Sequence, residues 1–297
     1  MGREAKNEDG RGLALILLST VAYGAMPILA KVAYGSGVRP IPLLAWRFLL
    51  ASLLFALLRS GPAPPISGRQ RLTLWAIGCV FVVNALCYFK ALETVPASTV
   101  ALLLYTYPVI VTLFSGLLGW EALTPRGLGS AGLAGAGCAL TAGGTLVAGP
   151  GVFFALLTAL LYATYIMLGS RFAAQVPAQT AALHITQVCA LVCVPWAIAQ
   201  GTLLLPSDVR AWGAVLGITV LSTVVALRAF LAGLARVGPA RASVLSSFEV
   251  VVTLALAVIL LGERLGPRQW SGAALVLGAV GLQNLGSRRR LGNAQGY

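Results

Sequence analysis

Residues 240–268 read ARASVLSSFEVVVTLALAVILLGERLGPR, an apolar run with one carboxylate, Glu249, near its middle. About 20 helical residues cross a hydrocarbon core about 30 Å thick, so this run is long enough to span a bilayer. Glu249 follows Ala240 by nine residues, which places it about 14 Å deep at about 1.5 Å of rise per residue. A charged group at that depth is costly and usually faces a cavity or a partner. The run therefore predicts a transmembrane helix that carries a functional acid.

The chain also contains an earlier copy of this stretch. Residues 97–126 read ASTVALLLYTYPVIVTLFSGLLGWEALTPR. Each of the two stretches follows a proline and ends in a glutamate, with a second proline four residues after the glutamate. These positions are Pro96, Glu121 and Pro125 in the earlier stretch and Pro239, Glu263 and Pro267 in the later one. Another pair of segments also matches: GLALILLSTVAYGAMPILAKVA from Gly12 and GVFFALLTALLYATYIMLGSRFA from Gly151, which aligns Tyr23 with Tyr162. The pattern predicts two copies of one unit.

The composition predicts an integral membrane protein. Hydrophobic residues make up 58% of the 297 residues and charged residues only 10%, whereas soluble domains carry about 25% charged residues. The net charge of +13 comes from basic residues at the ends of apolar runs, where they anchor helices at the membrane surface. Membrane lipid is therefore an expected partner and nucleic acid is not. No cofactor or metal is expected, because no phosphate-binding loop has the right context and the five cysteines, all in apolar segments, lack ligand spacing.

Ten apolar segments can be marked, joined by short connections rich in glycine and proline. Most are about twice as long as barrel strands and lack their alternation, so helices are expected. The predicted fold is an all-α membrane protein with ten transmembrane helices, arranged as two inverted five-helix repeats around a central cavity. We expect the first repeat within 1–148, the second within 151–285 and a basic cytoplasmic tail over 286–297. The segments are 12–34, 41–58, 72–92, 97–118, 127–148, 151–170, 179–199, 212–234, 240–261 and 269–285.

The distribution of lysine and arginine predicts the orientation. The side that holds both termini collects thirteen of these residues and the opposite side six, while Arg47 and Arg228 lie within spans. The positive-inside rule then places both termini in the cytoplasm. Because each unit has an odd number of spans, the second unit enters from the opposite side. Inverted repeats of this kind are typical of alternating-access transporters, whose site lies at the repeat interface near mid-bilayer.

The two halves resemble EamA-type proteins of the drug/metabolite transporter superfamily. The resemblance rests on PVIVTLFSGLLGWEALTP from Pro108, on SSFEVVVTLALAVILLGERLGPRQWSGAALVLGAVGL from Ser246, and on AWR at 45–47 and ARAS at 240–243. It implies ten helices around a central cavity and export of amino acids or other small metabolites across the bacterial inner membrane. One position departs from the family pattern: the acid of the ninth helix is often followed by proline, and here Val250 follows Glu249. Pro108 removes a backbone bond in the first unit, so we expect a break there and a straighter helix in the second.

Glu249 is the leading candidate for a proton-coupling group. Burial disfavours the charged form of a carboxylate, which suits reversible proton binding. The alternative is a structural ion pair with Arg47 or Arg228. Arg47, about 9 Å deep in the second span, can pair with a substrate carboxylate or extend to the outer face. For Arg228, extension toward the surface is the favoured interpretation.

Aromatic and polar residues at mid-bilayer are the candidates for lining a cavity. Tyr105 and Tyr107 occupy the place in the fourth span that Ser247, Phe248 and Glu249 occupy in the ninth, and Tyr23 and Tyr162 lie about 16 Å into their spans. These side chains can contact an amphipathic solute, or they can pack or face lipid. Weaker candidates are Trp46, Asn84 and Tyr88, and the lone histidine, His184, is more readily explained as a packed or interfacial residue than as a proton relay.

The predicted function is secondary active transport of a small solute, coupled to protons. The chain has no nucleotide-binding motif, so an ion gradient or the gradient of the solute itself must supply the energy. Alternatives are a gradient-driven facilitator, an uptake carrier, or a membrane interaction protein. An intramembrane enzyme is disfavoured because paired acids, a metal set and a nucleophile beside a base are missing from the sequence, so no enzymatic activity is expected. The identity of the solute, the direction of transport and the oligomeric state stay open at this point.

Overall fold

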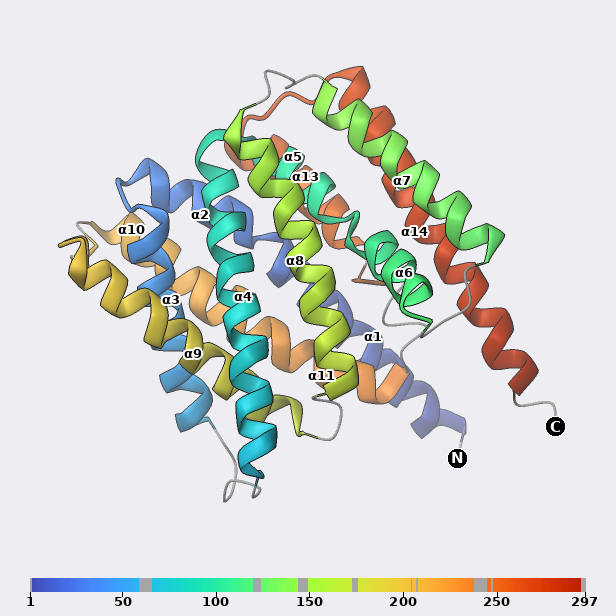
Figure 1. Cartoon of the computed structure of the whole chain (residues 1–297), viewed down its shortest axis with the longest axis horizontal. Coiled ribbons are helices and arrows are strands. Elements are labelled where there is room, and N and C mark those ends of the chain that lie inside the picture. Colours follow the sequence, from blue (N-terminus) through green and yellow to red (C-terminus); the bar gives the residue numbers. More distant parts are fainter. Residues whose placement is uncertain are drawn as a thin grey trace.

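The structure of the chain is a computed structural model that describes residues 2–58, 66–119, 124–143, 149–172, 176–203, 205–206, 208–237, 245–246 and 248–294. Every regular element in these ranges is a helix, with no strand among them (Figure 1). Seven helical segments are long and apolar enough to cross a membrane, and two shorter apolar helices cover Gly127–Leu140 and Phe248–Leu261. The predicted all-α membrane fold is confirmed.

The first repeat contains helices over all five predicted segments. Its first segment is α1 (Gly2–Gly24) followed by α2 (Met26–Gly35), and its fourth is α5 (Ala97–Leu104) followed by α6 (Tyr107–Leu117). The other three are α3 (Pro40–Leu57), α4 (Gly68–Thr94) and α7 (Pro125–Gly143).

The second repeat follows the same order. It contains α8 (Pro150–Phe172), α9 (Ala178–Ala199), α10 (Val209–Leu216), η1 (Gly217–Val225), α11 (Ala226–Val237), α13 (Phe248–Leu261) and α14 (Pro267–Ala294). Of these, η1 is a π-helix within the eighth span, between α10 and α11. Helix α14 continues through 286–294, the part of the chain expected to form a basic tail. Its arginines and leucine are good helix formers, which favours that continuation.

Two spans of the first repeat are broken next to a proline. Helix α5 ends at Leu104 and α6 begins at Tyr107, because Pro108 has no N–H to donate to the carbonyl one turn earlier. The break expected from Pro108 is therefore confirmed. A similar break, not foreseen, separates α1 from α2 at Ala25, just before Pro27. Both breaks lie well inside their spans, near the positions of the candidate tyrosines.

The helix pairs follow the symmetry of two related units. Helix α4 packs along α8, and α1 packs along α11. Each of these two pairs joins the third span of one repeat to the first span of the other. The two pairs are therefore equivalent under the symmetry that relates the repeats. Three other pairs, α3 with α9, α5 with α13, and α7 with α14, join equivalent spans. Figure 1 shows the α7–α14 pair along one edge of the bundle.

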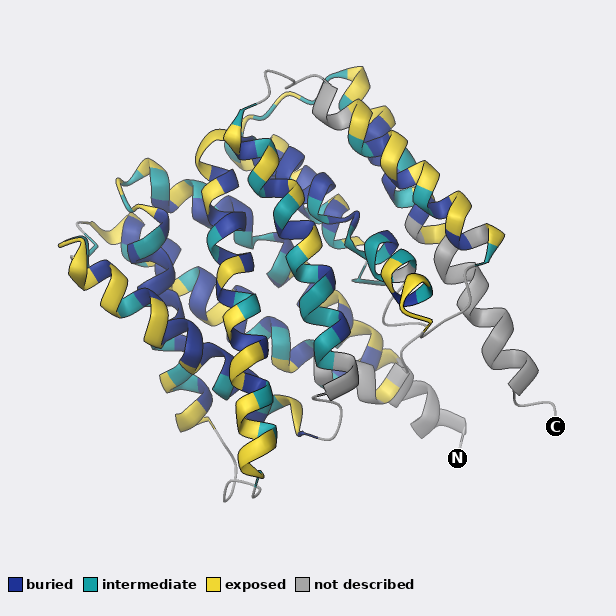
Figure 2. Cartoon of the chain, viewed as in Figure 1, coloured by how far each residue is buried: buried dark blue, intermediate teal, exposed yellow. Residues whose placement is uncertain are grey.

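Burial distinguishes an inner and an outer side on several of the described helices (Figure 2). The outer sides carry large apolar side chains, such as Leu57, Leu117 and Ile259, each about three-quarters exposed or more. Such surfaces suit lipid rather than water. Inside, a continuous core joins α2, α3, α4, α8, α9, α10 and η1, and the Asn84 Nδ2 of α4 donates to the Thr158 carbonyl of α8 at 2.8 Å. This core holds the two repeats together.

Candidate functional site

Glu249 lies in the first turn of α13, where it faces the broken span of the other repeat. The hydroxyl of Tyr105 lies 3.3 Å from Glu249 Oε2 and donates to the Ser246 carbonyl at 2.7 Å. The single O–H of Tyr105 donates to one oxygen at a time, so an ionised Glu249 can accept it in place of the Ser246 carbonyl, and a protonated Glu249 can donate to the same hydroxyl. The pair therefore offers a hydrogen-bond partner to both states of the acid, and it joins the two repeats.

The expected alternative, an ion pair between Glu249 and an arginine, does not occur among the described residues. The ion pair found in those ranges joins Lys90 to Glu93. Arg228 is exposed on α11, as expected of a side chain that extends toward the surface. Glu249 is thus a partly buried acid whose charge is not neutralised by a salt bridge in the described part of the chain.

A close contact with the first span fixes the position of α13. The hydroxyl of Thr253 donates to the carbonyl of Gly24 at 3.0 Å. A Cβ atom built on Gly24 would lie 2.9 Å from Val252 Cγ1 and 3.2 Å from the Glu249 carbonyl oxygen. A side chain at residue 24 would therefore force the helices apart, and glycine lets the break between α1 and α2 lie directly against the turn that carries Glu249.

Six aromatic rings form a continuous series that begins at Tyr105, which we call the aromatic chain. Successive ring centroids are separated by 5.8, 4.8, 5.8, 4.9 and 6.2 Å, within the favourable range for aromatic pairs. The rings come from both repeats, so the series crosses the interface twice, between Tyr107 and Tyr162 and between Tyr165 and Phe81. Its members are, in order, Tyr105, Tyr107, Tyr162, Tyr165, Phe81 and Phe48.

Arg47 lies at the far end of the aromatic chain. Its guanidinium carbon is 5.0 Å from the ring centre of Phe48 and 5.4 Å from that of Phe89, and its Nε donates to Thr223 Oγ1 at 3.1 Å. Only 5% of the side chain is exposed, so Arg47 points inward and does not extend to the outer face. No described carboxylate forms an ion pair with it.

The π-helix positions Thr223 for this contact. Its hydroxyl donates to the Ile218 carbonyl five residues earlier at 2.9 Å, as the wider π-helical turn allows. The oxygen is then left to accept from Arg47. Two further tyrosines, Tyr23 and Tyr88, interact electrostatically with both Glu249 and Arg47. Each of these tyrosines is therefore close enough to both Glu249 and Arg47 to interact with their charges.

Other candidates take different places. Phe248 is 52% exposed, and no ring contact of the described residues includes it. Ser247 lies outside the described residues. Trp46 packs against Trp212 with ring centres 5.6 Å apart, and His184 Nδ1 lies 3.2 Å from Gln187 Oε1 of the same helix. The structure therefore brings together Glu249 with Tyr105, Tyr107 and Tyr162 but does not join Phe248 to them.

Several residues near this site were not singled out from the sequence. Tyr165 follows Tyr162 by three residues, a spacing that places both on one helix face, and this signal was available. Thr223 gave no such signal, because the wider turn of η1 changes which residues face inward. Phe81 and Phe48 are ordinary apolar residues in the sequence, and only the packing shows that they continue the aromatic chain.

Glu263, expected only as a marker of the repeat, caps a helix of the other repeat. It accepts hydrogen bonds from the Ala97 and Ser98 N–H groups at 2.7 and 3.1 Å, and from Ser98 Oγ at 2.5 Å. Free N–H groups and the helix dipole favour a carboxylate at that position. Helices α5 and α13 are thus joined at one end by this cap and further along by Tyr105 and Glu249.

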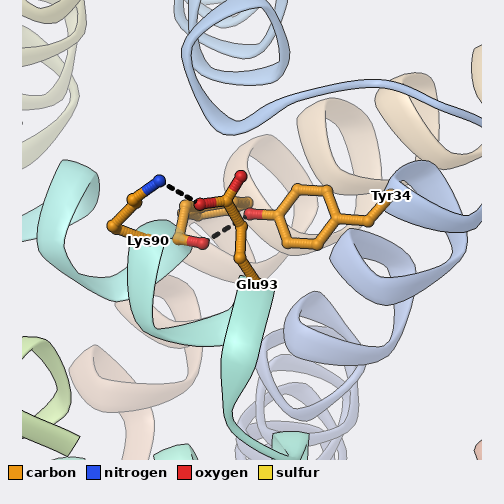
Figure 3. A network of polar contacts seen from close by, with 4 residues as sticks. Tyr34, Lys90 and Glu93 are labelled. Atoms are coloured by element: carbon orange, nitrogen blue, oxygen red, sulfur yellow. Dashed lines mark hydrogen bonds and ion pairs between the residues drawn. The ribbon is translucent and has the colours of Figure 1, made fainter. Parts of the chain in front are cut away.

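A second group of contacts lies where α4 ends and leads into α5 (Figure 3). The Tyr34 hydroxyl of α2 donates to the Phe89 carbonyl at 2.7 Å. Lys90 and Glu93 form an ion pair on the same stretch of α4. The Tyr34 contact links α2 to α4, whereas an exposed ion pair within one helix adds little stability.

The described residues contain no group of three or more His, Cys, Asp or Glu side chains that could hold a metal ion. What they do place together is an acid, a base and a series of tyrosines at the interface of two repeats. Such a set can contact a solute that has both charged and apolar parts.

Comparisons with known proteins agree with this fold. The chain is 28% identical over 280 residues to "Uncharacterized transporter YcbK" of Bacillus subtilis (strain 168), covering 87% of this chain and 88% of that protein. It is 27% identical over 252 residues to "Uncharacterized inner membrane transporter YedA" of Escherichia coli (strain K12), covering 83% and 82%. A solved structure described as "Crystal structure of protein" matches with a TM-score of 0.65 at 19% identity, covering 94% of this chain and 98% of that one, which shows the fold alone.

The family comparison covers both repeats. The model of the EamA-like transporter family matches residues 10–143 and again residues 149–285. These ranges contain Tyr105 in the first match and Glu249 in the second, so the contact between them joins the two family units. The chain is a membrane transporter that belongs to the EamA-like transporter family.

Proposed function

We propose that this protein is a proton-coupled secondary transporter that exports amino acids or other small amphipathic metabolites across the bacterial inner membrane. The observation that carries the proposal is the contact between Glu249 of the second repeat and Tyr105 of the first. Inverted-repeat transporters bind their solutes at such an interface. An acid that has a partner in both protonation states can bind and release a proton there without breaking the interface.

The solute site proposed here lies around this contact. Tyr107 and Tyr162 are each half-buried, and their rings meet edge to face at 4.8 Å. They, together with Tyr23 and Tyr105, offer apolar ring surface and hydroxyl groups to a solute that is partly apolar and partly polar. Arg47 is also assigned to the site, whereas Phe248, which is 52% exposed, is not, and Ser247 lies outside the described residues.

Proton binding at Glu249 would alternate with solute binding as the protein opens to one side and then to the other. When the surroundings of Glu249 are dry, the neutral acid is favoured, and when water or a cationic group reaches it, the charged form is favoured. Opening first to one side and then to the other would load and release a proton. Proton entry down its gradient would then drive solute exit.

The test is flux in proteoliposomes with purified protein. Glu249→Gln keeps the shape of the side chain and removes its titration, so we expect it to exchange solute but to lose accumulation driven by a pH gradient. Glu93→Gln, a change at an exposed acid in the Lys90 ion pair, serves as the matched control and should behave as wild type. If Glu249→Gln still concentrates solute at the wild-type level, the coupling role is refuted. Flux that never responds to a pH gradient would instead identify a facilitator.

A further inference from the structure

Arg47 is a buried cation that makes one hydrogen bond within the described part of the chain, through its Nε. Its Nε is occupied by Thr223, while its two terminal nitrogens have no hydrogen-bond partner among the described residues. Within those ranges, two buried side-chain oxygens are inaccessible to solvent and have no hydrogen-bond partner. They are the hydroxyls of Ser19 and Ser222. Within the described residues, the two terminal nitrogens are therefore the donors of Arg47 that are left for an anion.

The surroundings compensate only part of the charge. The rings of Phe48 and Phe89 attract the guanidinium through their faces. The other groups that interact with it are Tyr23, Tyr88 and the thiols of Cys189 and Cys193, and none of these is an anion in its ordinary state. An unpaired charge in a membrane interior is expensive, and an anion that arrives with the solute would remove this cost.

We propose that Arg47 is the anion-binding end of the solute site, and that the transported solute carries a carboxylate held by the two terminal nitrogens. Because Nε is already bound to Thr223, the remaining donors form a planar fork that points away from the side-chain stem. A carboxylate matches two parallel N–H donors in that plane. The apolar body of the solute then lies along the aromatic chain toward Tyr162 and Tyr107. This inference rests on the proposed transport function and names the substrate class.

Thr223 acts in this arrangement as a positioning residue. It holds Nε, and the π-helix in turn holds Thr223 through the Ile218 carbonyl. The fork therefore has a fixed orientation instead of rotating about the side chain. A positioned bidentate contact discriminates between a carboxylate and the amide of the same shape, because the amide has only one acceptor oxygen and no charge.

The test compares acids with their own amides. The probes are 3-phenylpropanoate, hexanoate, phenylalanine and tyrosine, each beside its amide, and binding is measured by thermal stabilisation of the purified wild-type protein. We expect at least one acid to bind about tenfold more tightly than its amide, the size of effect given by one charge-assisted hydrogen bond. Arg47→Gln should abolish this preference, and Thr223→Val should reduce it. Arg228→Gln, which removes an exposed arginine of α11, should leave it unchanged.

Two results would overturn the proposal: no acid is preferred by the wild-type protein, or Arg47→Gln prefers the acid as the wild type does. If Arg47→Gln fails to fold, Arg47→Lys keeps the charge and removes the fork, and an unchanged preference in that variant also refutes the proposal. Failure of the transport function looks different. In that case, proteoliposomes show no flux of any solute. Flux that depends on Tyr107 without any preference for carboxylates would leave the transport function standing and remove only this inference.

Discussion

The cap that Glu263 places on α5 predicts a large loss of stability when it is removed. Ala97 and Ser98 are almost fully buried, at 0% and 1% exposure, and the Glu263 carboxylate accepts from both of their N–H groups and from the Ser98 hydroxyl. In Glu263→Ala, these donors lose their acceptor in a place that water reaches poorly. An unsatisfied buried donor costs about 1–3 kcal/mol, and the loss of a helix N-cap alone costs about 0.5–2 kcal/mol. We therefore expect a loss of about 3 kcal/mol.

The free energy of unfolding can be measured by titrating the purified protein from mild detergent into a denaturing one, with tryptophan fluorescence as the signal. Glu263→Gln keeps one acceptor oxygen and should lose about half as much stability as Glu263→Ala. The matched control is Glu93→Ala, which removes an exposed ion pair within one helix and should cost less than about 1 kcal/mol. Equal losses in Glu263→Ala and Glu93→Ala would show that the cap does not stabilise the interface of the repeats.

Three further predictions concern the site and the topology. Gly24→Ala should destabilise the protein by about 1–3 kcal/mol, because the added Cβ meets Val252 at 2.9 Å. Gly132→Ala, whose added Cβ meets nothing within 4 Å, should be neutral or stabilising. Equal effects of the two substitutions in the same detergent titration would contradict this prediction. Tyr107→Ala or Tyr162→Ala should weaken solute binding about tenfold or more, at roughly 1.4 kcal/mol per factor of ten, with little change in the free energy of unfolding. Phe153→Ala, at an exposed ring, should bind the solute normally. Unchanged affinity in calorimetry for both tyrosine variants would show that these rings only pack. Reporter tags fused at Met1 and Tyr297 should both lie in the cytoplasm, and a tag on the outside would contradict the even number of spans.

Much of the fold could be predicted from the sequence because hydropathy and proline act locally. An apolar run of about twenty residues specifies a span wherever it occurs, and Pro108 breaks the fourth span because its missing N–H leaves a carbonyl free. The repeat pattern, which pairs Tyr23 with Tyr162 and Glu121 with Glu263, indicated two related units.

The details of the site depended on packing that the sequence does not specify. The depth of Arg47 along its helix did not show whether its side chain turns inward, and only the contacts with Phe48, Phe89 and Thr223 settle that. The π-helix changes which residues face inward, so Thr223 could not be identified from helical spacing. The cap on α5 joins residues 165 positions apart, and nothing local in either segment indicates that contact.

The central claim is that Glu249 couples solute movement to proton movement, and proton flux driven by a solute gradient tests it most directly. Proteoliposomes are loaded with a transported solute and an entrapped pH-sensitive dye, and no pH gradient is applied. In the wild type, solute leaving down its gradient should bring protons in and acidify the interior. In Glu249→Gln, the same solute should leave without acidification. Equal acidification in both proteins would contradict the claim, as would wild-type solute efflux without any proton movement.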